Sequence, residues 1–427
     1  MRVVVVGGGP AGLAAADAAA QAGADVVLVD SEPRLGGQYH RGTEQHVDPR
    51  VRHLPLSTVW ATEGRRLHVR TRPADSPHRT GQVLDADAVV LATGAHDHVV
   101  PFPGWDLPGV YTAGAAQTLA KAHGVAVGER VVVSGTGPFL LPVAHELRKI
   151  TRVVALLEAN GVGGWARHPW AAAGKLGELA GYAHLLPRVR TRTAVVAAHG
   201  EDRVTAVTVA RLNPDWSIRE DTRRRIAVDA VCVGHGFTPR LDLAVSIGCD
   251  IVNGFVRVDT TGATSIPGVY AAGEITGIGG AALAAAEGTV AGSAAARAPQ
   301  PPLDALRAVR RGRAFAAALA SAHPLPSGRH TWLTPDTTLC RCEEVTVRDL
   351  DAALARGAAD GRTLKLTSRA GLGLCQGRVC GREVTALATT RLGHPLPDAE
   401  AFHRRPFATP VRLGELADTP LLPEEDP

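Results

Sequence analysis

Four of the six cysteines stand in two close pairs near the C-terminal end of the chain. Cys340 and Cys342 form a C-x-C pair, and after 32 further residues Cys375 and Cys380 form a C-x4-C pair. Four thiolates in one array can hold an iron–sulfur cluster or a zinc ion. Structural zinc usually spaces its ligands C-x2–4-C, so the C-x-C half fits zinc poorly. The spacing therefore favours a tetrathiolate [2Fe–2S] centre, with zinc or disulfides as the alternatives.

The residues around the second pair suit such a centre. Glycine recurs at positions 371, 373, 377 and 381, which leaves room for backbone N–H groups to point at sulfur. Those hydrogen bonds, with the positive charge of Arg341 and Arg378, offset cluster charge and tune its potential. The other two cysteines, Cys232 and Cys249, are expected to be small buried apolar side chains.

A second candidate site lies at the N-terminus, where a glycine turn joins a strand to a helix. The β-branched run 2–6 precedes Gly-Gly-Gly-Pro-Ala-Gly at 7–12. An alanine-rich helical stretch is expected over 13–22, and the apolar strand 26–29 ends in Asp30. Strand, glycine turn, helix, strand and terminal acid together form the fingerprint of a dinucleotide-binding fold.

Each residue of this fingerprint has a physical reason. Gly7 permits the tight turn, Gly9 lets a pyrophosphate approach the backbone, and Gly12 lets the helix pack on the strand. The helix N-terminus offers free N–H groups and a positive dipole to the phosphates. Asp30, eighteen residues after Gly12, stands where a ribose hydroxyl is held. A glycine turn without a ligand is the alternative, and the flanking elements argue against it.

The same architecture recurs further along the chain. The strand 131–133 leads into Gly-Thr-Gly-Pro-Phe-Leu at 135–140, a helix to about residue 149 is expected, and the strand 153–157 ends in Glu158. Leucine at position 140 replaces the third glycine, and a larger side chain there pushes the helix away from the strand. We favour a relic scaffold; an NAD(P) site with Glu158 on the ribose is the alternative.

Several other segments have a clear local pattern. Residues 58–90 alternate apolar and polar side chains, which predicts β-hairpins, and the strand 87–91 closes on a small-residue turn at 92–94. Such a turn lets backbone approach a dinucleotide. The segment 268–274 is followed by a glycine-rich turn and an alanine-rich helix to about residue 292. A further helix is expected over 303–321.

The composition excludes several broad classes of function. The 427 residues, 45% apolar and 21% charged, indicate an ordinary globular protein of several domains. The net charge of +4 is small and spread out, so no nucleic-acid partner is indicated. No stretch of about 18 apolar residues lacks glycine clusters, so no membrane span is expected. The N-terminus mimics a signal peptide, but cleavage would destroy the glycine turn. We expect a cytoplasmic location, or one peripheral to the inner face of the membrane.

The glycine fingerprint, the turn at 92–94 and the segment 268–274 together resemble the two-dinucleotide-binding-domain flavoproteins. The resemblance implies an α/β fold of two Rossmann-like domains, one nested in the other, with FAD on the first fingerprint. Glu274 replaces the aspartate that contacts the flavin chain in that family. The inserted domain resembles the family's NAD(P) domain.

The cysteine segment resembles the [2Fe–2S] domain of bacterioferritin-associated ferredoxin, through Cys-Arg-Cys-Glu-Glu-Val-Thr at 340–346 and Cys-Gln-Gly-Arg-Val-Cys at 375–380. With the motifs at 94–96, 101–105 and 232–237, the chain resembles one narrower family from residue 1 to about 415. That family is the large flavin-containing α subunit of multi-subunit, dye-linked amino-acid dehydrogenases. It includes subunits of hydrogen cyanide synthase, opine oxidase, and proline or hydroxyproline dehydrogenase.

This resemblance implies partners as well as cofactors. Substrate oxidation is assigned to a separate β subunit with its own FAD, and FMN is shared between subunits in some members. A small ferredoxin-like subunit is a further candidate partner. The expected domains are an FAD-binding domain at 1–105 and 255–297, a degenerate NAD(P)-binding-like domain at 106–254, a linker at 298–332, a small [2Fe–2S] domain at 333–395 and a C-terminal tail at 396–427.

The resemblance and the motifs together give a set of expected site residues. The cluster ligands are the four cysteines of the array, and no residue is assigned as a catalytic acid or base. His96, His98 and His235 are candidates, but structural histidines are commoner. The expected FAD contacts are Gly7, Gly9, Pro10, Ala11, Gly12, Asp30, Ser31, Gly37, Gln38, Ala92, Thr93, Gly94, Gly273, Glu274, Gly280 and Ala281.

We therefore expect an electron-transfer flavoprotein subunit of an amino- or imino-acid dehydrogenase. Electrons from a partner's flavin would reach this chain's FAD or its [2Fe–2S] centre and leave to an acceptor. The helix that follows Gly273 would point its positive end at the flavin pyrimidine. One alternative is a stand-alone NAD(P)H-dependent reductase that uses the second fingerprint. The other is a non-catalytic nucleotide-binding scaffold subunit.

Overall fold

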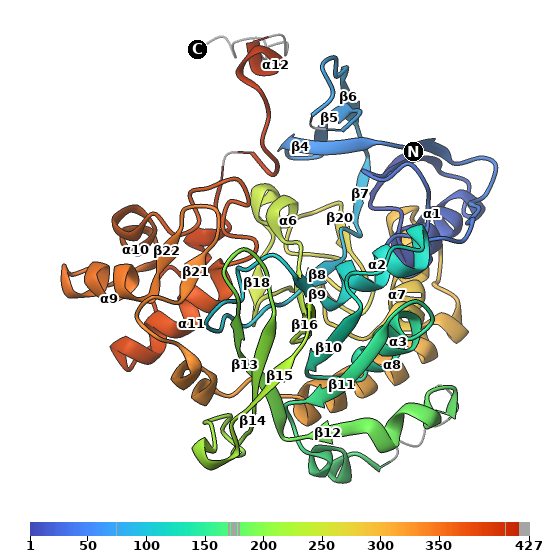
Figure 1. Ribbon diagram of the computed structural model, residues 1–427. Helices are drawn as coiled ribbons and strands as arrows, with labels where there is room; N and C mark the ends of the chain where they lie inside the picture. The colour runs from blue at the N-terminus through green and yellow to red at the C-terminus, as the bar shows by residue number, and fades with distance from the viewer. Residues whose placement is uncertain (74, 170, 172–176, 178–179, 406, 418–427) are drawn as a thin grey trace. The chain divides into compact units, whose positions relative to one another are not determined.

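The computed structural model describes all residues except 74, 170, 172–176, 178–179, 406 and 418–427 (Figure 1). The chain divides into two compact units, each built from segments distant in sequence. Unit 1 comprises Met1–Ala95, Pro239–Arg313 and the segment from Arg404, and unit 2 comprises His96–Thr238 and Ala314–His403. No helix among the described residues is long and apolar enough to cross a membrane.

Unit 1 is organised around a five-stranded parallel sheet with the order β20-β7-β1-β2-β3. A three-stranded antiparallel sheet, β4-β5-β6, accompanies it and confirms the predicted hairpins. The elements of unit 1 are β1 (Arg2–Val6), α1 (Pro10–Gln21), β2 (Asp25–Val29), β3 (Arg52–Leu54), β4 (Ser57–Glu63), β5 (Arg66–Thr71), β6 (Gly81–Asp85), β7 (Ala88–Leu91), α6 (Asp242–Ile247), β18 (Ile251–Val252), β19 (Phe255–Val256), β20 (Val269–Ala271), α7 (Ala281–Ala295) and α12 (Leu413–Ala417).

The valine run of β1 is buried on both faces, as a central strand of a parallel sheet requires. Because side chains alternate across a strand, Val3 and Val5 pack with helix α1 and the alanines of α7. Val4 and Val6 pack in the other cluster with the apolar residues of the antiparallel sheet. Unit 1 is therefore layered as helices, parallel sheet and antiparallel sheet.

Unit 2 repeats this architecture, so the predicted internal duplication is confirmed. Its parallel sheet has the order β12-β11-β10-β16-β9, and an antiparallel sheet β13-β14-β15 accompanies it. The elements of this repeat are β9 (Val110–Thr112), α2 (Ala113–His123), β10 (Arg130–Gly135), α3 (Leu140–Leu147), β11 (Arg152–Glu158), η1 (Val162–Arg167), η2 (Ala183–Arg188), β12 (Val189–Thr191), β13 (Thr193–His199), β14 (Ala206–Arg211), η3 (Glu220–Thr222), β15 (Arg224–Ala227) and β16 (Ala230–Gly234).

The cysteine segment also belongs to unit 2 and has a small core of its own, which contains Cys340 and Cys380. Its elements are η4 (Ser327–Trp332), β21 (Thr338–Cys340), β22 (Val345–Thr346), α9 (Val347–Ala355), α10 (Gly361–Ser368), α11 (Gly381–Leu392) and η5 (Ala399–Phe402). Three elements contain a boundary between the units: β8 (Ala95–Asp97), β17 (Phe237–Pro239) and α8 (Leu303–Ala322). Helix α8 matches the helix predicted over 303–321.

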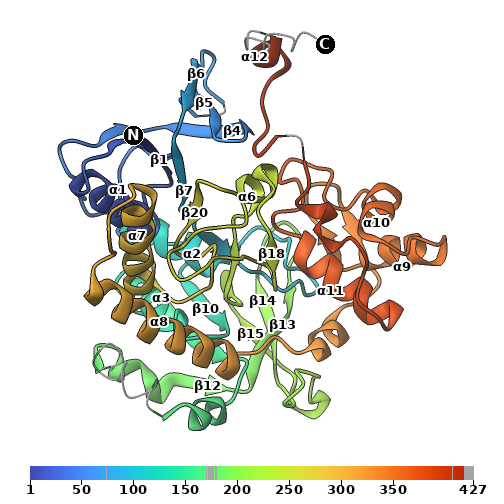
Figure 2. The same cartoon turned by 180° about the vertical axis from the view of Figure 1, so that it is seen from behind.

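Helices α1 and α7 come into direct backbone contact, and small residues make this possible (Figure 2). A Cβ atom placed on Gly288 would lie 2.0 Å from the Ala11 carbonyl oxygen. One on Gly292 would lie 2.2 Å from the Ala15 carbonyl oxygen. Glycines four residues apart on α7 thus face alanines four residues apart on α1, since positions i and i+4 share a helix face.

This contact generates a test on stability. Glycine to alanine in an open helix site stabilises by up to about 1 kcal/mol. At Gly292 the added methyl group meets backbone, so Gly292→Ala should lower the free energy of unfolding by about 1–3 kcal/mol. Gly414→Ala in α12, where no atom lies within 4 Å, is the matched control and should not destabilise. Denaturant unfolding of both variants decides it, and a gain in stability at Gly292→Ala would contradict the contact.

Candidate functional site

The first glycine turn has the close backbone contacts that its sequence predicts. Gly7 adopts a φ of +107°, and a Cβ there would lie 2.2 Å from the Ala92 carbonyl oxygen. A Cβ on Gly12 would lie 1.7 Å from the Gly7 carbonyl oxygen. Larger residues at either position would push strand, turn and helix apart. Both glycines are therefore required by the fold itself.

Gly9 differs, because no protein atom occupies the space that its side chain would fill. The nearest atom to a Cβ at Gly9 is the Gly37 Cα, 4.0 Å away, and its φ of −75° is open to any residue. Helix α1 begins directly after it with Pro10, and no side chain caps the helix. The first N–H groups of α1, including those of Ala11 and Gly12, have no intrahelical partner there. This open turn fits a pyrophosphate, which needs close backbone approach and free N–H donors.

The acid at the end of β2 lies beneath this turn. Asp30 is 7% exposed, and its carboxylate accepts hydrogen bonds from the N–H groups of Gly8 and Glu32, the latter at 2.6 Å. Burial raises the pKa of Asp30 above its ordinary value, while these two hydrogen bonds pull it down. Asp30 therefore holds the shape of the turn, and its contact with a ribose stays a prediction. Ser31, next to it, is exposed.

A loop that follows β2 covers the glycine turn. The Gly36 N–H donates to the Gly8 carbonyl oxygen at 2.8 Å. A Cβ on Gly37 would lie 2.9 Å from the Gly9 Cα, so this loop needs glycine as well. The side chain of Gln38 is exposed beside it.

The turn after β7 lies at the same end of the sheet, beside Gly7. The Ala92 N–H donates to the Val6 carbonyl oxygen at 2.8 Å. The Thr93 hydroxyl donates to the Arg240 carbonyl oxygen at 2.8 Å, which holds the turn in place. Gly94 adopts a φ of +70° with open space at its Cβ position. The fold thus brings the two sequence-predicted turns together at the carboxyl ends of adjacent parallel strands.

The segment after β20 is the third part of the site. Helix α7 begins at Ala281, eight residues after Gly273, so a loop separates this glycine from the helix. Gly280 precedes the helix with a φ of +84° and no side-chain cap. Glu274 is half-buried and hydrogen-bonded to the backbone of Gly280; burial raises the pKa of its carboxyl group.

Glu287 anchors this loop, and the sequence reasoning missed it. Its buried carboxylate accepts from the Gly273 N–H at 3.0 Å and from the Thr276 hydroxyl at 2.8 Å. The Arg313 guanidinium donates to its other oxygen at 2.9 Å. The sequence does contain a signal for this residue, which is a single acid within a helix of alanine and glycine. A carboxylate buried in such a helix needs hydrogen-bonding partners.

In the second fingerprint, in unit 2, the acid that would bind a ribose is hydrogen-bonded to groups of the protein itself. Glu158 accepts from the Thr136 hydroxyl at 2.7 Å, from the Gly137 N–H at 2.8 Å and from the Asn160 N–H at 2.8 Å. His323 lies against the same group, with Nδ1 3.1 Å from the Thr136 hydroxyl oxygen. Glu158, the acid that a working site would use to bind the ribose, therefore already has hydrogen-bonding partners within the protein.

Leu140 adds to this closure. It begins helix α3 and is 3% exposed within an apolar cluster, where the third glycine of a working fingerprint would lie. Trp165 donates from its indole N–H to His323 Nε2 at 3.1 Å, so His323 is held from both sides. These contacts favour the relic interpretation of the second fingerprint.

The four cysteines of the array lie together as a chain of neighbouring thiols. Cys380 is hydrogen-bonded to both Cys340 and Cys375, and Cys375 is also hydrogen-bonded to Cys342. All six cysteines of the protein are free thiols. Among the described residues, however, no group of three or more histidine, cysteine, aspartate or glutamate side chains is gathered to hold a metal ion. The [2Fe–2S] centre therefore stays a prediction.

Backbone N–H groups point at these sulfurs, as the glycine content predicts. Cys340 accepts from Gly371, and Cys375 accepts from Gly377. The hydrogen bond with Cys380 is the largest influence on both thiols, and it lowers the pKa of Cys340 to about 6 and that of Cys375 to about 4. Burial raises the pKa of Cys342, and the hydrogen bonds with Cys340 and Cys375 raise that of Cys380, so two of the four thiols favour the thiolate form and two favour the protonated form.

Two of the three candidate histidines, His96 and His98, are hydrogen-bonded to the cysteine segment within unit 2. His98 Nε2 lies 2.9 Å from Glu383 Oε1, and Arg329 donates to Glu383 Oε2 at 3.0 Å; all three are buried. His96 Nε2 lies 3.0 Å from the Arg378 carbonyl oxygen, between the two cysteines of the second pair. Burial lowers the pKa of His235 to about 3, so this imidazole is neutral at physiological pH.

Comparison with known proteins decides the family. The pattern of the family described as "Pyridine nucleotide-disulphide oxidoreductase" matches residues 1–288, which include both fingerprints and the loop after β20. The chain belongs to this family.

Its relatives are subunits of larger oxidoreductases. An opine oxidase subunit of Rhizobium meliloti (strain 1021) is 33% identical to this oxidoreductase, over 97% of this chain and 98% of that protein. The hydrogen cyanide synthase subunit HcnB of Pseudomonas protegens is 32% identical, over 89% of this chain and 90% of that protein. Among solved structures, L-proline dehydrogenase from P. horikoshii has a TM-score of 0.69 at 20% identity, over 97% of this chain and 79% of that one. The last is a likeness of fold.

Family membership confirms the predicted fold class in its α/β part. The protein is an FAD-dependent oxidoreductase with Rossmann-like parallel sheets, related to subunits of opine oxidase and hydrogen cyanide synthase. The family match ends before the cysteine array, so it leaves the [2Fe–2S] domain and the individual contact residues as predictions.

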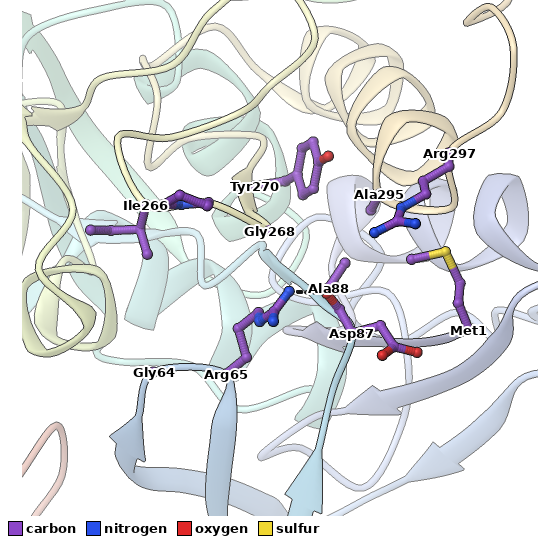
Figure 3. A pocket seen from close by; sticks show the side chains of 11 residues that line it. Met1, Gly64, Arg65, Asp87, Ala88, Ile266, Gly268, Tyr270, Ala295 and Arg297 are labelled. Carbon is purple, nitrogen blue, oxygen red and sulfur yellow. Dashed lines mark hydrogen bonds between the residues drawn. The ribbon is translucent and has the colours of Figure 1, made fainter.

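A pocket in unit 1 lies away from this site (Figure 3). Met1, Asp87 and Gly268 line it, and each directly precedes a strand of the parallel sheet. The pocket therefore lies at the amino ends of the strands, whereas the glycine turn lies at the carboxyl ends. Because dinucleotides bind at the carboxyl ends of such strands, we expect FAD at the glycine turn and not in this pocket.

The open space at Gly9 generates a test of FAD binding. Gly9→Val should fold, because no protein atom blocks the side chain, and should lose bound flavin, because valine fills the pyrophosphate's place. The ratio of flavin to protein absorbance measures the loss, and circular dichroism reports the fold. A folded variant with full flavin content would show the assignment wrong.

The closure around Glu158 generates a test of nicotinamide binding. We expect no saturable binding of NADH or NADPH to the purified protein at physiological concentrations, because the groups that would hold the ribose are already paired. Isothermal titration calorimetry measures this. Stoichiometric, tight binding that Glu158→Gln abolishes would overturn the relic interpretation.

Proposed function

We propose that this oxidoreductase is the electron-transfer flavoprotein subunit of a hetero-oligomeric amino- or imino-acid dehydrogenase. A partner subunit oxidises a substrate of the proline, hydroxyproline, opine or glycine-like class. One observation carries the proposal: the chain aligns with the opine oxidase subunit over nearly the full length of both proteins. A relationship of that extent includes the cysteine segment as well as the dinucleotide-binding fold.

The N-terminal site suits the FAD part of this role. The open turn at Gly9, the uncapped start of α1 and the glycine turns at Gly37 and Gly94 lie in one unit. FAD, once bound, accepts two electrons together and releases them singly. The uncapped N-terminus of α7 at Ala281 supplies a positive helix end for the negative charge of a reduced flavin.

The cysteine array suits the [2Fe–2S] part. Two irons need two ligands each, and the thiol contacts link both sequence pairs: Cys340 with Cys380, and Cys342 with Cys375. Backbone N–H donors from Gly371 and Gly377 stabilise thiolate charge. The protein's contribution is this donor set, and the centre itself moves one electron at a time.

Substrate chemistry belongs to the partner in this proposal. No residue of this chain is assigned as a catalytic acid or base: His96 and His98 are hydrogen-bonded to the cysteine segment, and His235 is buried and neutral. The partner is a flavoprotein β subunit, and the further components are FMN shared between subunits and a small ferredoxin-like protein. The assembly works in the cytoplasm or at the inner face of the membrane.

The two alternatives are less well supported. A stand-alone NAD(P)H-dependent reductase needs a second fingerprint that binds a nucleotide. In that fingerprint Glu158 already accepts hydrogen bonds from Thr136, Gly137 and Asn160. A non-catalytic scaffold needs no ordered thiol array. The reductant of the bound flavin separates the three hypotheses. Reduction by NADPH alone supports the stand-alone reductase, and reduction only through a partner with an amine substrate supports the proposed function. A flavin that neither reduces supports the scaffold.

The cluster assignment is tested by metal analysis. Protein purified anaerobically with its partners should contain two irons and two acid-labile sulfides per chain. Cys375→Ser should lose them and keep FAD, because the residues proposed to bind FAD belong to unit 1. Cys249→Ser, outside the array, is the matched control. One zinc per chain with no sulfide would mean a structural zinc site, and the electron-relay role would have to be given up.

A further inference from the structure

One short segment contacts the elements of both cysteine pairs, and the proposed function assigns it no role. It runs over residues 96–106 and includes most of the two sequence motifs at 94–96 and 101–105. The segment and all four cysteines of the array belong to unit 2. We call residues 96–106 the bracket segment.

The first end of the bracket segment contacts the chain before and after Cys380. His96 Nε2 lies 3.0 Å from the Arg378 carbonyl oxygen, and because a carbonyl oxygen only accepts, the imidazole donates. His98 Nε2 lies 2.9 Å from Glu383 Oε1. Arg378 precedes Cys380 by two residues, and Glu383 follows it by three, in the first turn of α11. These contacts therefore hold the second cysteine pair from both sides of its last member.

The other end contacts the strand of the first pair. The Trp105 indole N–H donates to the Thr338 carbonyl oxygen at 2.6 Å, and the Thr338 hydroxyl donates to the Asp106 carboxylate at 2.6 Å. Thr338 begins β21, which ends at Cys340. The guanidinium of Arg341, which follows Cys340, lies 5.2 Å from the centre of the Trp105 ring and donates to the Asp106 carbonyl oxygen at 3.2 Å.

Between its two ends the bracket segment is anchored in the core of unit 2. Phe102 is fully buried in the apolar cluster that also contains Trp105. The His98 N–H donates to the Gly236 carbonyl oxygen at 2.9 Å, and the Ala198 N–H donates to the Pro103 carbonyl oxygen at 2.8 Å. Prolines on both sides of Phe102 fix their own φ angles. A packed core therefore sets the distance between the two ends of the segment.

We propose that the bracket segment is a positioning element of the cysteine centre, in which His96 and Trp105 hold the two cysteine pairs at the separation that one four-thiolate centre requires. This inference rests on the proposed function, which assigns one centre to all four thiols. The two pairs are 32 residues apart, one at the end of a strand and the other in a loop before a helix, so their own local backbone does not fix their separation. Removal of a group that orients metal ligands from outside typically costs about 10–100-fold in metal affinity.

Two variants remove one donor each. His96→Ala removes the imidazole, whereas Trp105→Phe keeps an aromatic ring beside Arg341 and removes the indole N–H. In the anaerobically purified holoprotein, each variant should lose iron to excess bathophenanthroline about tenfold faster than the native protein. The g values of the dithionite-reduced centre in electron paramagnetic resonance should also change, because the ligand geometry changes.

Matched controls separate positioning from a general loss of stability. His96→Gln keeps an N–H donor at a similar reach and should restore native behaviour. Trp216→Phe removes another buried indole N–H of the same apolar cluster, which donates to Asn160 Oδ1 at 3.1 Å. His199→Ala removes an imidazole that is hydrogen-bonded to the Thr208 hydroxyl. Both of these variants should keep the native rate of iron loss and the native g values.

The outcomes separate this inference from the proposed function. Iron-loaded His96→Ala and Trp105→Phe proteins with native rates and native g values overturn the positioning role alone. So does a Trp216→Phe protein that loses iron as fast as Trp105→Phe, or a His96→Gln protein that behaves like His96→Ala. A folded His96→Ala or Trp105→Phe protein that retains no iron counts as accelerated loss. Native protein that contains zinc and no sulfide overturns the electron-relay function, and the rate of zinc loss from the same variants then tests the positioning role.

Discussion

The backbone contact between helices α1 and α7 is the constraint on which the cofactor-facing part of unit 1 depends. Gly288 and Gly292 let α7 approach the carbonyl oxygens of Ala11 and Ala15. The glycine turn precedes α1, and the loop from Gly273 to Gly280 precedes α7. Fixing the two helices against each other therefore fixes two segments that are more than 250 residues apart in sequence. Glu287, on the same helix, then holds the second segment through hydrogen bonds.

The two units show how one architecture serves different ends. In unit 1 the glycine turn is open at Gly9, and the acid Asp30 supports it from beneath. In unit 2 the corresponding acid, Glu158, binds the turn's own Thr136 and Gly137, and His323 covers it. The same strand order thus presents one open and one closed dinucleotide turn. This difference supports an electron relay that is fed by a partner and not by a nicotinamide.

The sequence predicted the parts of the site that depend on local patterns. Each of these patterns lies within about thirty residues of sequence and follows from backbone geometry or residue size. They are the glycines of the first turn, the strand that ends in Asp30, and the replacement of the third glycine of the second fingerprint by Leu140. The residues that close and anchor the sites were not predicted. His323 and Glu383 act through partners 54 to 285 residues away, and Glu287 through partners 11 to 26 residues away, and no local period reveals such a pair. Their common signal is a polar side chain in an apolar context, which shows that a partner exists but not which one.

The central claim is that electrons from a partner's substrate pass through this chain's flavin and its cysteine centre in turn. Freeze-quench electron paramagnetic resonance on the native complex, mixed anaerobically with its amine substrate, tests this most directly. The account predicts that flavin bleaching is followed by a paramagnetic iron signal, which disappears when an acceptor is added. Reduction of the acceptor at the full rate, with no iron signal at any time, would contradict it.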